Sequence, residues 1–104
     1  TEIEVRDGEQ SVRLVRGDFR DHPGLCEGLV VCNPPFGIRL QDQRRAQETV
    51  RALGDFLKQR CAGSTAWLVL GDRELVKHVG LRASRKVPVS IGGLDGRFVR
   101  VDLY

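Results

Sequence analysis

The stretch Leu29-Val30-Val31-Cys32-Asn33-Pro34-Pro35-Phe36-Gly37 decides the fold of this chain. Its apolar run, Leu29 to Cys32, is typical of a buried parallel strand. Pro34 favours an extended conformation at Asn33, and neither proline has an amide hydrogen to donate. We therefore expect a strand that leads directly into a rigid bend.

The rigid bend is also a candidate binding edge. The side-chain oxygen of Asn33 and the carbonyl oxygen of Pro34 can both point into a pocket, where they could accept the two hydrogens of one amino group. Two acceptors would orient the poorly nucleophilic exocyclic amine of a nucleobase beside a methyl donor, and Phe36 could stack on that base. In the structural alternative, the bend only ends a strand and Phe36 packs into the core.

Hydrophobic periodicity places the other elements around this strand. Apolar residues at helical steps predict a helix over 43–61, which Gly63 ends, and Asp72 is expected to cap a short second helix. Further strands are expected near residues 3–5, 12–15, 66–70, 84–91 and 97–104. The first two flank a turn at Asp7-Gly8, and the last two flank the Gly-rich connection 92–96.

This order of elements predicts an α/β fold with a mostly parallel sheet and a closing antiparallel hairpin. Ligands of such sheets bind beyond the carboxyl ends of the strands. Asp18 and Asn33 each follow a strand, so we expect both residues on the same rim of the sheet.

The composition indicates a soluble globular domain with a mild basic excess. Of the 104 residues, 40% are hydrophobic and 30% charged, which excludes a disordered or collagen-like chain. The net charge of +3 would help to hold a polyanion. Arg39, Arg44 and Arg45 follow the bend and could contact nucleic-acid phosphates, although a charged outer helix face explains them almost as well.

Cysteine and histidine positions predict no metal site. Cys26, Cys32 and Cys61 cannot all pair and lack the spacing of zinc ligands, while His22 and His78 have no second ligand at metal spacing. Reduced cysteines indicate an intracellular protein. No apolar run approaches the roughly 20 residues of a membrane span, so we predict a cytoplasmic location.

Residues 31–40, which read Val-Cys-Asn-Pro-Pro-Phe-Gly-Ile-Arg-Leu, resemble the [ND]PP[YF]-G-x-R-L signature of the THUMP-associated RNA guanine-N2 methyltransferases, a branch of the class I methyltransferases. The resemblance extends to residues 53–58, 67–71, 81–83 and 92–96. It implies a Rossmann-like fold, S-adenosylmethionine as cofactor, and guanine N2 of rRNA or tRNA as the methylated atom.

The same resemblance implies roles for individual residues. Asn33, Pro34, Pro35 and Phe36 would form the catalytic site for the target amine. Asp18 would contact the adenine of S-adenosylmethionine, with Asn33 also beside the cofactor. A plain Gly-Asp turn is an equal alternative for Asp18.

The chain departs from the family in one respect, because no Gly-rich cofactor loop precedes Asp18. Gly92-Gly93 and Gly96 join two late strands without a following helix, which indicates a hairpin. We therefore expect residues 1–104 to form part of a catalytic domain, inactive alone and completed by an upstream cofactor-binding half and a THUMP-type RNA-binding domain. Two other functions stay open, an adenine-N6 methyltransferase acting on DNA or RNA and a non-catalytic nucleic-acid-binding module.

Overall fold

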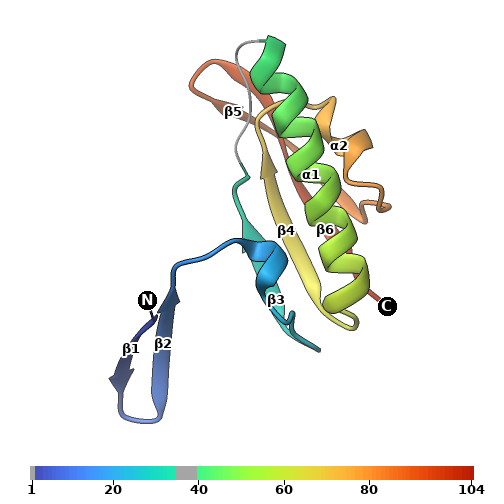
Figure 1. The fold of residues 1–104 in the computed structure, drawn as a ribbon. Coiled ribbons are helices and arrows are strands. Elements are labelled where there is room, and N and C mark those ends of the chain that lie inside the picture. The colour runs from blue at the N-terminus through green and yellow to red at the C-terminus, as the bar shows by residue number, and fades with distance from the viewer. Residues whose placement is uncertain (1, 35–39) are drawn as a thin grey trace.

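A computed structural model describes residues 2–34 and 40–104 of the chain. The strands and helices follow one another in an α/β order (Figure 1). They are β1 (Glu2–Asp7), β2 (Gln10–Val15), the short 3-10 helix η1 (Phe19–Asp21), β3 (Leu29–Cys32), α1 (Leu40–Arg60), β4 (Thr65–Leu70), α2 (Leu75–His78), β5 (Arg85–Ile91) and β6 (Leu94–Asp102).

The main sheet has four strands in the order β3-β4-β6-β5. β3 and β4 are parallel, with Cys32 opposite Leu68, and α1 forms the crossover between them. β6 runs antiparallel to both β4 and β5, which confirms the closing hairpin. Within the described residues the sheet is thus mixed, and only its β3–β4 pair has the parallel arrangement that we expected throughout most of the sheet.

The core lies between α1 and one face of this sheet. Alternation along β4 turns Ala66, Leu68 and Leu70 towards the helix, where each is fully buried. The helical residues predicted to share a face are all buried against them: Ala46, Val50, Leu53, Leu57 and Cys61. Apolar residues recur at every second position in the strand and at every third or fourth position in the helix. These two patterns therefore identified the same interface from its two sides.

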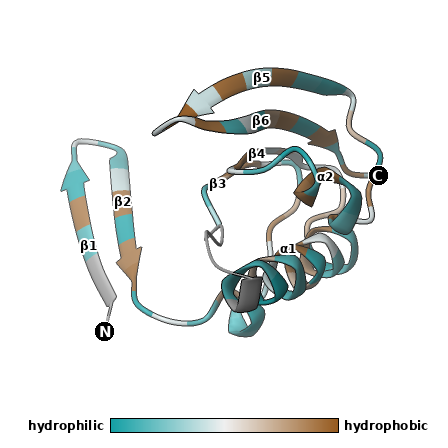
Figure 2. Cartoon of the chain, turned by 90° about the horizontal axis from the view of Figure 1, so that it is seen from above, coloured by the Kyte–Doolittle hydropathy of each residue, from teal (hydrophilic) through white to brown (hydrophobic). Residues whose placement is uncertain are grey.

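The opposite face of the sheet is only partly covered; it is apolar towards β3, whereas Arg100 of β6 also lies on it. Figure 2 shows α1 and α2 on one side of the four strands and neither helix on the other. On that open side, Trp67 stacks on Phe98 with ring centroids 4.6 Å apart. Leu29 and Val31 are 64% and 66% exposed, because β3 is an edge strand here. The expected burial of β3 is therefore wrong for this face, although Val30 and Cys32 do pack against the core.

The hairpin between β5 and β6 is tighter than its glycine content suggested. Ile91 pairs directly with Leu94, so only Gly92 and Gly93 form the connection. Both have positive φ angles, +55° and +84°, as two-residue hairpin turns require. Gly96 lies within β6, where a Cβ atom would come 2.6 Å from the carbonyl oxygen of Leu70. Glycine at this position permits close strand packing and does not mark a loop.

The first two strands form a separate hairpin. β1 and β2 pair through six residues each and stand apart from the main sheet (Figures 1 and 2). The following helix, η1, packs on the last turns of α1: Phe19 meets the ring of Phe56 at 5.7 Å, and the Arg60 guanidinium donates to the carbonyl oxygen of Arg20 at 2.7 Å. The chain then enters β3.

Candidate functional site

The rigid bend after β3 lies at the carboxyl edge of the main sheet. In the parallel register, Cys32 lies opposite Leu68, so Asn33 and Pro34 continue beside the last residues of β4. Asn33 is exposed, and its side chain has no hydrogen bond within the described residues, whereas Pro34 is buried. The first proline of the bend is thus held within the fold, while Asn33 is accessible to a ligand. The other predicted members of this site, Pro35 and Phe36, lie outside the described residues, as does Arg39.

Asp18 lies elsewhere in the molecule. Its carboxylate caps η1, accepting from the Arg20 backbone N–H at 2.9 Å and from the Arg20 guanidinium at 3.0 Å. These bonds, the backbone one foremost, lower the pKa of Asp18. Because β2 belongs to the separate hairpin and η1 packs near Arg60, Asp18 does not share a sheet rim with Asn33. That expectation was wrong because sequence order alone cannot show that β2 and β3 belong to different sheets.

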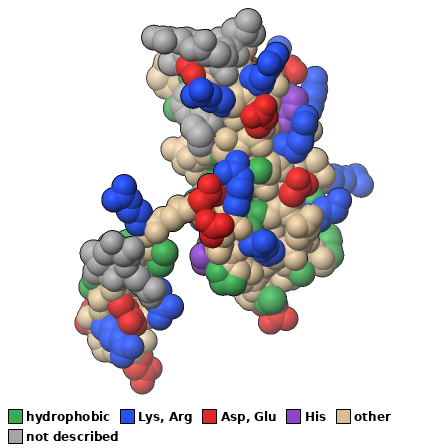
Figure 3. Space-filling view, in the orientation of Figure 1, with side chains coloured by type: hydrophobic (Ala, Val, Ile, Leu, Met, Phe, Trp, Pro, Cys, Tyr) green, Lys and Arg blue, Asp and Glu red, His purple; other side chains and the backbone are tan. Residues whose placement is uncertain are grey.

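Basic side chains cover the outer face of α1. Arg44 and Arg45 are both exposed in its first turns, close in sequence to the bend. Figure 3 shows Lys and Arg side chains over the helix with acidic side chains between them. The arrangement therefore fits either phosphate contact or a solvated helix face.

The cysteines and histidines form no reactive cluster. Cys26 is exposed, Cys32 half-buried and Cys61 buried, and all three are unpaired. His22 accepts from the backbone N–H of Gly24 at 2.9 Å, which is a local structural bond. Across residues 2–34 and 40–104, no group of His, Cys, Asp and Glu could hold a metal ion. The same residues contain no helix with the length and apolar character of a membrane span.

Burial raises the pKa of the Cys32 thiol, which reduces the fraction of reactive thiolate at a given pH. We therefore expect iodoacetamide at pH 8 to alkylate exposed Cys26 several-fold faster than Cys32, and buried Cys61 slowest of all. Peptide mapping by mass spectrometry over a time course measures the three rates. Faster modification of Cys32 than of Cys26 would show that the thiol beside the bend is activated.

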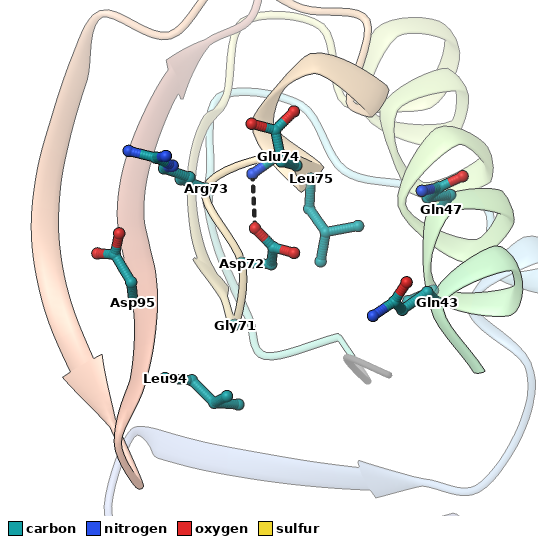
Figure 4. Close-up of a pocket in the computed structure, with 10 residues that line it drawn as sticks. Gln43, Gln47, Gly71, Asp72, Arg73, Glu74, Leu75, Leu94 and Asp95 are labelled. Atoms are coloured by element: carbon teal, nitrogen blue, oxygen red, sulfur yellow. Dashed lines mark hydrogen bonds between the residues drawn. The ribbon is translucent and has the colours of Figure 1, made fainter. Parts of the chain in front are cut away.

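A cavity opens at the same carboxyl edge, between the start of α1 and the loop that follows β4. Its volume is about 320 Å³, at the lower end of the range for small-ligand sites. Figure 4 shows Asp72 and Gln43 pointing into it from opposite sides, with the side chain of Leu75 between them and that of Leu94 farther away at the start of β6. Two further charged residues, Arg73 and Asp95, lie at its rim.

Sequence reasoning missed this cavity. Asp72 was predicted only as a helix cap, and this was wrong because the N-cap of α2 is Glu74. Asp72 instead accepts from the backbone N–H of Glu74 at 2.9 Å, in the turn that precedes the helix. Leu94 and Asp95 were placed in a hairpin connection. The signal was nevertheless present, because Asp72 and Arg73 follow the carboxyl end of β4 just as Asn33 follows that of β3.

Comparison with known proteins identifies the family. The model of a family described as RMKL-like, methyltransferase domain, matches residues 7–100, which is most of the chain. The chain belongs to this family. Its core, its closing hairpin and its Asn-Pro-Pro bend thus lie within one RMKL-like methyltransferase domain.

Two relatives contain a stretch that is similar to this chain. A Synechocystis sp. protein named as a candidate RNA methyltransferase is 39% identical over 88 residues, covering 84% of this chain and 23% of that protein. The ribosomal RNA large subunit methyltransferase K/L of Pseudomonas aeruginosa is 34% identical over 96 residues, covering 88% of this chain and 13% of that protein. The chain therefore spans less than a quarter of the length of either relative.

A solved structure confirms the fold class. A candidate methylase from Clostridium difficile 630 superposes with a TM-score of 0.71 at 21% sequence identity, covering 85% of this chain and 23% of that one. The RMKL-like domain described here therefore has the Rossmann-like methyltransferase fold that the sequence predicted.

Proposed function

We propose that this RMKL-like domain is the substrate-side part of an enzyme that transfers a methyl group from S-adenosylmethionine to the exocyclic N2 amine of guanine in RNA. The observation that carries the proposal is the bend after β3, where exposed Asn33 is anchored by buried Pro34 at the edge of the sheet that binds ligands in such folds. Membership of a methyltransferase family supports it. The Pseudomonas relative, which is named as an rRNA methyltransferase, supports rRNA as the substrate, with tRNA as the second choice.

The bend would act by orienting the amine. The lone pair of an exocyclic amine is delocalised into the base, so the nitrogen is a weak nucleophile. If the Asn33 side-chain oxygen and the Pro34 carbonyl each accept one of its hydrogens, the nitrogen becomes more tetrahedral and its lone pair is fixed in direction. No separate base is needed before attack, since the nitrogen would become positively charged only when the new bond forms and would then release one proton to solvent water. Phe36 would hold the base by stacking.

When bound, S-adenosylmethionine supplies a methyl group on a positively charged sulfur. Asp18 is the candidate contact to its adenine, because a carboxylate has about four lone-pair sites and the two bonds from Arg20 leave some of them free. Asn33 would lie beside the reacting methyl group. Asp18 and Asn33 lie apart in this domain. They can contact the same ligand only if other parts of the complete protein position η1 and the β1–β2 hairpin.

We propose that an upstream half of the complete protein positions η1 and its hairpin and supplies the Gly-rich cofactor loop. We also propose that the complete protein contains a THUMP-type RNA-binding domain. The open apolar face supports this proposal, since Leu29, Val31, Trp67 and Phe98 form a continuous surface along an edge strand. Arg44 and Arg45, with Arg39, would contact RNA phosphates near the target base. A cytoplasmic location stays a prediction.

The open face gives a test of the upstream half. Val31→Thr should change stability by no more than about 0.5 kcal/mol in the 104-residue chain, where Val31 is 66% exposed. In the complete protein the same change should cost about 1 kcal/mol or more, because a hydroxyl would be buried against the covering segment. Hydrogen exchange of the β3 amides measures both values, with Ala62→Ser in an exposed turn as control. Equal small effects in both proteins would contradict the proposal.

The function itself is tested with the complete protein, labelled S-adenosylmethionine and RNA that lacks the modification. After digestion to nucleosides, the label is expected in N2-methylguanosine. Label in N6-methyladenosine alone would establish the adenine alternative. That alternative has one observation in its favour, a fold similarity to a predicted N6-adenine-specific DNA methylase from Listeria monocytogenes, with a TM-score of 0.58 at 22% identity.

Calorimetry separates the enzyme from a non-catalytic nucleic-acid-binding module. The complete protein should bind S-adenosylmethionine in the micromolar range, on the order of −8 kcal/mol, and RNA as well. A module that only binds RNA would give no heat with the cofactor.

A further inference from the structure

We infer that the cavity beside the bend is a guanine-specific base pocket in which the Asp72 carboxylate accepts the N1–H of the target base. This inference rests on the proposed function and adds the residue that selects the base. It is carried by the position of the cavity, by the chemistry of the side chains in it, and by the partners that those side chains already have.

The cavity lies at the same edge of the sheet as the bend, although neither Asn33 nor Pro34 lines it. Gly71 follows the last residue of β4, and the parallel register puts Asn33 and Pro34 beside the end of that strand. Gln43 reaches the cavity from the first turn of α1, the helix that begins after the bend. Leu75 and Leu94 add aliphatic surface to the lining of the cavity.

Asp72 is the acceptor that points into this space. Its Oδ1 accepts from the Glu74 backbone N–H at 2.9 Å, and its Oδ2 has no partner among residues 2–34 and 40–104. The other carboxylates nearby are engaged. Asp95 accepts from the Arg97 guanidinium at 2.7 Å, and Glu74 accepts from the Lys77 ammonium at 3.0 Å. Asp72 differs from both in that its partner is a backbone N–H and not a cation, so its negative charge stays available to a ligand in the cavity.

A carboxylate at this position distinguishes the bases. An ionised carboxylate only accepts hydrogen bonds. Guanine carries a hydrogen on N1 next to its N2 amine, so Asp72 can take the N1–H while Asn33 and Pro34 take the two amine hydrogens. Adenine has an unprotonated N1 beside its N6 amine, and two acceptors facing one another repel. Asp72 is exposed in the domain alone, so this rejection acts only when the bound base excludes water from the carboxylate.

Gln43 can complete the recognition. Its carboxamide has both a donor and an acceptor, so it can bond O6 of guanine through its N–H group. The Arg73 guanidinium points towards Asp95 at the rim, where it balances the negative charge of the Asp95 carboxylate (Figure 4).

The test compares guanosine with 2-aminopurine riboside at the target position of an RNA that the complete protein methylates. 2-Aminopurine keeps the amine but has no hydrogen on N1 and no O6. The parent enzyme should prefer guanosine by roughly 10 to 100-fold in kcat/KM, as expected for loss of a specific base contact. Asp72→Asn should reduce this preference at least about tenfold, because an amide N–H can donate to the unprotonated N1.

Asp72→Asn keeps an oxygen for the Glu74 N–H, so the loop after β4 should retain its conformation. The matched control is Glu48→Gln, an exposed carboxylate of α1 that does not line the cavity, which should leave the base preference unchanged. An unchanged preference in Asp72→Asn would overturn the inference, as would a tenfold loss of S-adenosylmethionine affinity in that variant. If the parent enzyme methylates adenine and no guanine, the proposed function fails first and the inference falls with it.

Discussion

Asn33→Ala in the complete protein is expected to lower the rate constant for methyl transfer by roughly 100-fold or more, with little change in the affinity for S-adenosylmethionine. The substitution removes one of two acceptors that orient the amine, and this orientation matters most in the transition state. A single-turnover assay with saturating cofactor and RNA measures the rate constant directly. Binding of the cofactor is measured separately by calorimetry.

The structure makes this a clean experiment. Asn33 is exposed and has no hydrogen bond within the described part of the chain, so its loss should not unfold β3 or the bend. Asn33→Asp is the matched variant, because aspartate keeps an acceptor oxygen and also occurs in the family signature. It should retain more activity than Asn33→Ala. Near-parental turnover in Asn33→Ala would remove Asn33 from the mechanism.

The sequence predicted the core well because two independent periodicities agree. The helix from Leu40 to Arg60 begins three residues before the expected position. Its first three residues could not be predicted because the apolar pattern that identified the helix starts only at Ala46. The buried face of β4 was likewise correct. Strong periodicity therefore located the elements, and only their ends were displaced.

The errors arose where the answer depends on distant parts of the chain. The sequence of an apolar strand such as β3 has the same pattern whether the second face of the strand is covered or, as here, exposed at Val31. In the β5–β6 hairpin, Gly92, Gly93 and Gly96 look alike in the sequence. Two of them supply positive φ angles, whereas Gly96 allows close approach to the Leu70 carbonyl. Tertiary contact, which no local pattern encodes, separates these roles.

The candidate site was only half predictable for a related reason. The Asn-Pro-Pro sequence predicts its own backbone conformation, because proline restricts the backbone whatever surrounds it. Asp72 has no such mark, and the turn that it stabilises before α2 gives a sufficient local account of it. Its second role depends on Gln43 and Leu94 being brought opposite it by α1 and β6. Residues that act through such convergence can be found only once the fold is known.

Gly54→Ala is expected to destabilise the domain by about 2 kcal/mol, although it places a better helix former inside α1. Helix propensity alone would give a gain of about 1 kcal/mol. However, a Cβ atom at Gly54 would lie 1.8 Å from the backbone oxygen of Val79, at the end of α2. Backbone cannot rotate away as a side chain can, so α2 must shift, and overpacking of this kind costs about 1–3 kcal/mol or more.

Hydrogen exchange of the complete protein measures this effect where it arises, since the amides of α1 and of the segment from Asp72 to Val79 should exchange faster in Gly54→Ala. Gly17→Ala is the matched control, because a Cβ there meets nothing within 4 Å and its exchange pattern should match the parent. Displacement of α2 would also move the loop that carries Asp72, so the preference for guanosine over 2-aminopurine should fall together with stability. Unchanged or slower exchange in Gly54→Ala would show that α1 and α2 are not packed as closely as the structure requires.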